Sequence, residues 1–321
     1  MVFDIKKEIK LGRPNLSTLS ITTYAQSINR IHGKLVKDYE YKDLEFKNGF
    51  AFLEKRHDDI VKILDAYAPT TRKNMLNAII VALKCSPSKG EESKACIKYG
   101  KLRDSYNKIY EDEQSTGQKT KKQKENWVEW SKYKKMVAYF GKEIRRMRVR
   151  QKTVLSLEER RIFGDYVLLR LYQDYPLRND YHDVKVVTSK ASQDDGDNYL
   201  VRSKNAMTLI LNEYKTKKAY GKKEIKLNSG VVSLLKDYLK INKSGWLIID
   251  EKTDEPLSSI GITRRLNRIT LDRLGKKIGS NMIRHSYLSD KYADSVEEMK
   301  KDSEIMGHSV ETQKKYIKGD D

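Results

Sequence analysis

Residues 112–124, DEQSTGQKTKKQK, contain no apolar side chain. Such a segment cannot contribute to a hydrophobic core, so it is best read as a connection between two parts that fold separately. The 321 residues of the chain are enough for two domains of ordinary size. We therefore expect a first domain over residues 1–111, a basic linker over residues 112–124 and a second domain over residues 125–321.

The first domain has the periodicity of helices throughout. Ile60, Ile63 and Leu64 are spaced as on one helix face. Pro69 and the threonines after it look like the start of another helix, since proline is favoured in the first helical turn. The apolar stripe of that helix consists of Met75, Leu76, Ile79, Ile80 and Leu83. The pattern predicts an all-α domain.

The second domain mixes helices with short strands. Ser156 and Glu159 form a capping-box signature for a helix that must stop before Pro176. Four strand-like runs follow, at Val184–Thr188, Tyr199–Arg202, Met207–Asn212 and Glu224–Leu227. Trp246–Asp250 is either one more strand or a short edge, and from Ser258 onward the chain again reads as helices. The expected fold class is α+β, mainly α, with a small antiparallel sheet.

The charge of the chain favours a polyanionic partner. Lysine and arginine number 65 against 45 acidic residues, a net charge of +20. Two clusters hold the candidate DNA-binding residues: Lys121, Lys122 and Lys124 in the linker, and Arg145, Arg146, Arg148 and Arg150 further on. A solvated surface on a lysine-rich chain is the simpler alternative, but clustering of the cations favours nucleic acid.

The composition also bears on where in the cell the protein acts and on which cofactors it uses. No apolar run approaches the ~20 residues of a membrane span, and the N-terminus lacks the apolar region of a secretory signal. Cys85 and Cys96 are too few for a disulfide framework, and with the five scattered histidines they show no metal-ligand spacing. We expect an intracellular protein, in a host cytoplasm or nucleus or associated with a virion, with no metal, no cofactor and no membrane partner.

The C-terminal residues carry a recognisable order of side chains. Arg284 and His285 fall on one predicted helix, His308 follows Gly307, and Tyr316 comes eight residues after His308. This order resembles the tyrosine recombinase (phage-integrase type) family, whose signature is an arginine with a nearby histidine, then Gly-His, then a nucleophilic tyrosine. The resemblance implies that Arg284 is the second catalytic arginine, His308 the Gly-His histidine and Tyr316 the nucleophile.

Other positions extend the resemblance. Arg178 sits where the family has its first arginine, and Lys215 follows the third strand-like run, where the family has a hairpin lysine. Asn281 stands where the family usually has histidine, and Asp180 is one place closer to the arginine than usual. These two residues and His285 are taken as supporting residues. The first domain, with its Pro-Thr-Thr-Arg helix, is similar to the family's DNA-clamping domain.

The resemblance implies a definite chemistry. Arg178 and Arg284 would hold the phosphate oxygens, Tyr316 would form a 3′-phosphotyrosyl link, and Lys215 would protonate the departing 5′ oxygen. Each of these residues taken singly is more simply a surface, turn or packing residue. Lys217, Lys218, Lys222 and Lys223 surround Lys215, so the choice among the hairpin lysines stays open.

The predicted function is a site-specific DNA recombinase or integrase of a mobile element, phage or virus. Its expected partner is double-stranded DNA, bound by a homotetramer on paired sites. A type IB topoisomerase-like enzyme, a telomere-resolving strand transferase and an inactive DNA-binding relative are the alternatives. Only residues 317–321 follow Tyr316, so if the chain ends there we expect protomers to be coupled by another surface or by an exchanged tyrosine helix.

Overall fold

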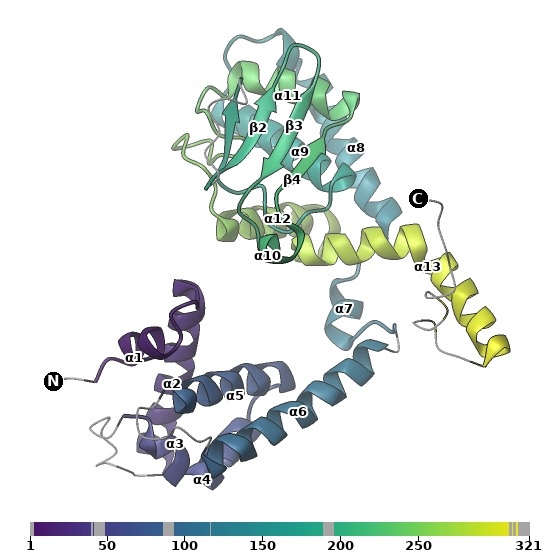
Figure 1. Cartoon of the computed structure of the whole chain (residues 1–321). Helices are drawn as coiled ribbons and strands as arrows, with labels where there is room; N and C mark the ends of the chain where they lie inside the picture. Colours follow the sequence, from purple (N-terminus) through teal and green to yellow (C-terminus); the bar gives the residue numbers. More distant parts are fainter. Residues whose placement is uncertain are drawn as a thin grey trace. The chain divides into compact units, whose positions relative to one another are not determined.

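A computed structural model describes residues 3–39, 41, 49–85, 93–115, 117–188, 196–307, 310 and 313. The chain divides into two compact units, residues 1–118 and residues 119–321. Each unit has a hydrophobic core of its own. Figure 1 labels helices and strands of the two units. The division falls inside the segment 112–124 that the sequence analysis took for a linker.

The first unit, as far as it is described, is made of helices. These are α1 (Ile5–Gly12), α2 (Thr18–Asp38), α3 (Ala51–Lys55), α4 (His57–Asp65), α5 (Pro69–Lys84) and α6 (Lys94–Ser115). In α2, Ile21, Ala25 and Ile28 recur at helical spacing and are buried. The apolar stripe predicted for residues 75–83 lies on α5 and is buried as expected.

The second unit combines helices with one sheet. Its helices are α7 (Lys121–Asn126), α8 (Trp130–Arg146), a short 3-10 helix (Val149–Gln151), α9 (Leu157–Asp174), α10 (Lys217–Tyr220), α11 (Ser229–Ile241), α12 (Ser259–Leu274) and α13 (Ser280–Met306). Its strands are β1 (Val184–Val187), β2 (Asn198–Arg202), β3 (Met207–Leu211) and β4 (Lys223–Lys226). The mainly α, α+β fold class is confirmed.

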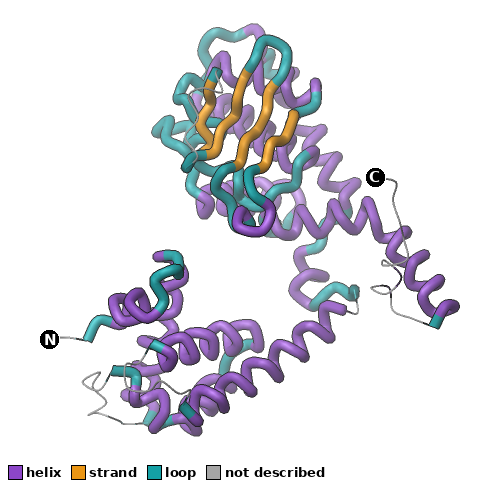
Figure 2. The backbone as a smooth tube through the Cα atoms, in the orientation of Figure 1, coloured by secondary structure: helices purple, strands orange, loops and turns teal. Residues whose placement is uncertain are grey.

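The sheet has the order β1-β2-β3-β4, and its strands lie side by side in Figure 2. β2, β3 and β4 pair antiparallel, but β1 pairs parallel to β2, so the prediction of an antiparallel sheet was wrong for β1. The alternation of apolar and polar residues shows which face of a strand is buried. It does not show whether the strand runs parallel or antiparallel to its neighbour, because that depends on the segment that joins the two strands. Trp246–Asp250 is a short edge with isolated bridges rather than a strand.

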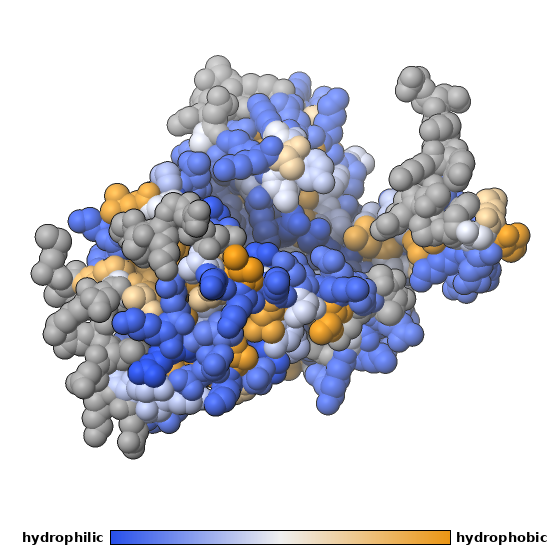
Figure 3. Space-filling model, turned by 60° about the horizontal axis from the view of Figure 1, so that its bottom comes forward, coloured by the Kyte–Doolittle hydropathy of each residue, from blue (hydrophilic) through white to orange (hydrophobic). Residues whose placement is uncertain are grey.

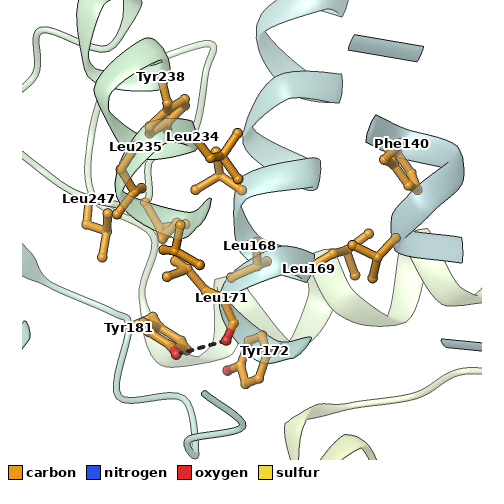
Figure 4. Packing of buried hydrophobic residues seen from close by; sticks show 14 of the residues in the cluster. Phe140, Leu168, Leu169, Leu171, Tyr172, Tyr181, Leu234, Leu235, Tyr238 and Leu247 are labelled. Carbon is orange, nitrogen blue, oxygen red and sulfur yellow. Dashed lines mark hydrogen bonds between the residues drawn. The ribbon is translucent and has the colours of Figure 1, made fainter. Parts of the chain in front are cut away.

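Helix α9 forms the centre of the second core. Its capping box at Ser156 and Glu159 is present as predicted. Leu168, Leu169 and Leu171 are fully buried, and Figure 4 shows this part of α9 packed among side chains of α8 and α11. A helix that is apolar around most of its circumference must be covered on several sides. The surrounding elements, among them α8 and α11, therefore pack around α9.

The predicted linker is more structured than its composition suggested. Helix α6 continues to Ser115, and Thr120 and Gln123 form a capping box that begins α7. The absence of apolar side chains predicts a connection outside either hydrophobic core. Capping and propensity can nevertheless support short helices that bury little surface. Residues 112–124 thus contain parts of two helices.

A buried ionic cluster joins α9, α12 and the loop after Trp246. Arg265 is 7% exposed, and its Nε donates to Asp165 Oδ1 at 2.6 Å while its Nη2 donates to Glu251 Oε1 at 2.6 Å. Burial raises the pKa of Glu251, and the charge of Arg265 opposes that rise. The cluster packs against Gly164 of α9, where no side chain stands in its way.

Candidate active site

Arg178 lies in the loop between α9 and β1. Two buried phenols fasten the backbone of this loop to the end of α9. The Tyr172 hydroxyl donates to the Arg178 carbonyl oxygen at 2.9 Å, and the Tyr181 hydroxyl donates to the Tyr175 carbonyl oxygen at 2.6 Å. The loop is thus held by the core itself, which orients the half-buried Arg178 side chain.

Asn179 fastens the same loop to α12. Its Nδ2 donates to the Ser259 carbonyl oxygen at 2.9 Å and to Thr263 Oγ1 at 2.7 Å. Sequence analysis missed the roles of Tyr172 and Asn179. Tyr172 looked like one more apolar position of α9, and the only sign for Asn179 was its place beside Arg178.

Arg284 reaches the same region from α13. Ile283 and Ser286 bury one side of this helix, and Arg284 between them is half-buried. Burial raises the pKa of Tyr172, while a hydrogen bond with Ser280 and the charge of Arg284 act against that rise. The phenol that holds the Arg178 loop therefore also lies near the start of α13.

Asp180 is the common neighbour of the two arginines. Burial raises the pKa of its carboxyl group, and the charges of Arg178, His182, Lys223 and Arg284 oppose this rise. A charge can act on a half-buried carboxylate in this way only from within a few ångströms to about a nanometre. Asp180 therefore lies within electrostatic reach of both Arg178 and Arg284, although the two arginines are far apart in the sequence.

The two guanidinium groups are available for a ligand. Within the described ranges of the chain, neither Arg178 nor Arg284 donates a side-chain hydrogen bond or forms an ion pair. Arg265, in contrast, uses its guanidinium fully on two carboxylates and two backbone carbonyls. Half-buried arginines with free donors, both within electrostatic reach of one carboxyl group, suit an anion with several acceptor oxygens.

The hairpin between β3 and β4 carries the candidate lysines. Lys215 is exposed, and among the described residues it forms no ion pair, whereas Lys217 pairs with Glu213 at 2.6 Å. The Lys223 ammonium lies 4.4 Å from the centroid of the Tyr214 ring. Lys223 is also the hairpin lysine whose charge acts on Asp180. The charge of Lys223 thus reaches the same carboxyl group as the charges of the two arginines, and nothing in the sequence separates Lys223 from Lys215.

The remaining candidate catalytic residues, His308 and Tyr316, lie outside the described residues. Helix α13 ends at Met306, and Gly307 follows in the left-handed conformation with φ of 72°. Gln313 is described, and its side chain is hydrogen-bonded to the Ser303 hydroxyl on α13.

The supporting residues on α13 play no visible part in the arginine arrangement. Asn281 is exposed and His285 is half-buried. Neither side chain has a hydrogen-bond partner in the part of the chain that is described.

The predicted DNA-binding residues fall at opposite ends of α8. Arg145 and Arg148 are exposed near its C-terminal end, where Arg146 pairs with Glu143 and Arg150 pairs with Asp237, both at 2.7 Å. Lys121 and Lys124 are exposed on α7, before α8 begins, and the side chain of Lys122 lies outside the described part. Helix α8 rises about 25 Å, so the two clusters are separate surfaces.

No protein-family model matches the chain, and a search of curated proteins finds no match either. In the described residues, no helix is both long enough and apolar enough to cross a membrane. The same residues contain no group of side chains suited to hold a metal ion. The face seen in Figure 3 is largely hydrophilic, with apolar side chains scattered across it.

Proposed function

We propose that this protein is a site-specific DNA recombinase of the tyrosine type, acting for a mobile element, phage or virus. The observation that carries the proposal is the convergence of Arg178 and Arg284 on Asp180, with both guanidinium groups free of described partners. The family order of residues in the sequence supports it independently. We infer an intracellular place of action, in a host cytoplasm or nucleus or in a virion.

The chemistry needs positive charge where negative charge develops. Arg178 and Arg284 hold the non-bridging oxygens of the scissile phosphodiester. The Tyr316 phenol gives its proton to His308 or to water, and its oxygen attacks phosphorus to form a 3′-phosphotyrosyl bond. The bond from phosphorus to the 5′ oxygen breaks, and a hairpin lysine gives that oxygen a proton. The covalent link keeps the phosphodiester energy, so a free 5′-hydroxyl can reverse the step on another strand.

Asp180 has a definite electrostatic role in this scheme. Both guanidinium charges act on Asp180, and its carboxylate offsets their positive charge while the site is empty. A phosphate that enters takes over that role and also repels the carboxylate. The raised pKa of Asp180 allows the carboxyl group to become neutral more easily than an exposed aspartate could.

Helix α13 suggests that the enzyme works as an assembly. From Arg284 to Ser303 the helix rises about 28 Å, and Gln313 is bonded to Ser303 at the far end. We propose that this long helix couples protomers within the homotetramer expected on paired sites, and that exchange of Tyr316 between protomers is one way in which it would do so.

The exposed apolar residues of α13 support such an assembly. Leu288, Tyr292 and Val296 recur every four residues along one side of the helix and are 48%, 45% and 44% exposed. A regular apolar stripe on a helix is typical of a surface that another element covers. We propose that contacts between protomers form along this stripe.

A covalent-trapping assay tests the proposed reaction. Full-length protein is incubated with nicked and supercoiled DNA in EDTA and quenched with SDS, and adducts are resolved by electrophoresis. We expect an adduct at 3′ ends that is absent in Tyr316→Phe and strongly reduced in Arg178→Ala and Arg284→Ala. Tyr110→Phe, which alters an exposed tyrosine of α6 that lies outside the proposed protomer contact, is the matched control and should form the adduct normally.

The outcomes separate the alternatives. Relaxation of plasmids without paired sites, through the same adduct, would assign the protein to the topoisomerase-like enzymes. Hairpin products would assign it to the telomere-resolving strand transferases. Tight binding of a broad DNA library without any adduct would make it an inactive DNA-binding relative. An adduct that persists in Tyr316→Phe would refute the assignment of the nucleophile.

A further inference from the structure

The second unit has a basic groove that contains none of the residues of the arginine site. It consists of two adjoining hollows that share Lys132 and Leu274. The first, of about 350 Å³, is lined by Lys119, Lys124, Trp127, Val128, Glu129, Lys132, Leu274 and Lys276. The second continues along α8 past Lys135, Met136 and Tyr139 to Arg273. We name this surface the α8–α12 groove.

Three of the six cations of the groove are held in place without being neutralised. The Lys119 ammonium lies 3.8 Å from the centroid of the Trp127 ring, and the Arg273 guanidinium lies 4.1 Å from that of Tyr139. Lys276 Nζ donates to the Trp127 carbonyl oxygen at 2.8 Å. An aromatic face or a neutral carbonyl positions a cation but leaves its charge and its other N–H donors free.

The residues that line the groove carry a large excess of positive charge. Six cations line it, and Glu129 is the one carboxylate among its lining residues. Arg146 and Arg150, elsewhere on the same unit, are each paired with a carboxylate at 2.7 Å. Most polar groups that line the groove are hydrogen-bond donors, and most of their positive charge is not compensated. Such a surface fits a negatively charged ligand with many acceptor oxygens.

The shape of the groove favours a chain of phosphates over one phosphorylated small molecule. From Lys132 to Tyr139, α8 rises about 10 Å. DNA places one phosphate per about 3.4 Å of axis on each strand, so the groove has room for more than one. A single phosphate group could engage only a fraction of the cations.

We propose that the α8–α12 groove binds the phosphodiester backbone of DNA at a site separate from the arginine pair. The proposal shares with the proposed function the identity of the partner, DNA, and does not require strand cleavage. The groove would then anchor DNA on the catalytic unit itself, where the chain enters that unit. It would contact phosphates only and so contribute affinity without sequence preference.

The test is the salt dependence of DNA binding by the full chain. A labelled duplex of random sequence is titrated by fluorescence anisotropy at several NaCl concentrations. Lys124→Gln/Lys132→Gln removes two groove cations that form no ion pair with described residues. The matched control, Lys236→Gln/Lys243→Gln, removes two exposed lysines of the same unit that do not line the groove.

We expect the groove variant to weaken binding and to make the slope of log affinity against log salt shallower by about 2, since each phosphate contact contributes about 0.9. The control should leave the slope unchanged. Equal slopes in both variants would overturn the proposal. Two competition results would also overturn the proposal. If inorganic phosphate competes as effectively as DNA, the groove is a simple anion pocket. If a polyglutamate peptide does so, the groove binds an acidic protein partner.

Covalent trapping at low salt keeps the two proposals apart. The groove variant should still form the Tyr316 adduct when DNA is in excess, because its arginine pair is intact. Wild-type protein that shows the groove-dependent salt slope but never forms an adduct would refute the recombinase function and leave the groove proposal standing.

Discussion

Replacing Gly164 with alanine should destabilise the second unit, although alanine is normally the better residue in a helix. A Cβ atom on Gly164 would lie 2.1 Å from Glu251 Oε1 and 2.5 Å from Arg265 Nη2. Both atoms belong to buried side chains that hold each other at 2.6 Å. The methyl group can be accommodated only if Glu251 moves away from Arg265.

The expected magnitude follows from two opposing effects. Separating one partner from a buried ion pair costs about 3 kcal/mol, at the lower end of the range because Arg265 keeps Asp165. Alanine in place of glycine in a helix returns about 1 kcal/mol. We expect Gly164→Ala to lower the free energy of unfolding by about 2 kcal/mol. Gly230→Ala, in the exposed first turn of α11 with only ordinary contacts, should raise it slightly.

Urea denaturation followed by tryptophan fluorescence measures this change selectively. All three tryptophans, Trp127, Trp130 and Trp246, belong to the second unit, so the signal does not report unfolding of the first. In a Glu251→Ala background, which makes room for the methyl group, Gly164→Ala should have a much smaller effect. A neutral or stabilising Gly164→Ala in the otherwise unchanged protein would refute the reasoning.

Two further predictions concern the arginine site. A bound phosphate should raise the pKa of Asp180 further, so DNA binding takes up a proton and affinity should rise as the pH falls from neutral towards that pKa. The test compares Asp180→Asn with its parent in a His182→Gln background at constant ionic strength. Asp180→Asn should bind DNA more tightly at neutral pH, and its DNA affinity should no longer depend on pH in this range. If the pH dependence persists, another group is responsible. Lys215→Ala should slow cleavage of ordinary DNA but not of DNA with sulfur at the departing 5′ position, which needs no proton. If the sulfur-containing DNA instead restores cleavage by Lys223→Ala, then Lys223 is the general acid.

Much of the local structure was predictable because it depends on neighbouring residues. Ser156, Glu159 and Pro176 define both ends of α9 before any tertiary contact is considered. Alternating apolar residues and polar turns placed each strand within about a residue of its observed ends. The parallel pairing of β1 and the capping of α7 were missed, the first because it depends on a distant partner and the second because Thr120 lies in a stretch that lacks apolar residues.

The candidate site was predictable in part. The order of Arg178, Lys215 and Arg284 came from resemblance to a family, since the spacing of these residues alone does not place them together. That Asp180 lies near both arginines, and that Lys223 acts on it, depends on how α13 and the β3–β4 hairpin pack. Of the α8–α12 groove, Lys124 was among the predicted DNA-binding residues, but the groove itself was not predicted because its walls join residues 119–139 to residues 273–276.

The double role of Tyr172 links the interior of the protein to its surface chemistry. One buried phenol of α9 holds the backbone of Arg178 and lies within electrostatic reach of Arg284. A change in the packing of α9 would therefore move the Arg178 loop relative to the start of α13 without touching either arginine. The distance between the arginines, and with it the size of anion they can span, is a property inherited from the core.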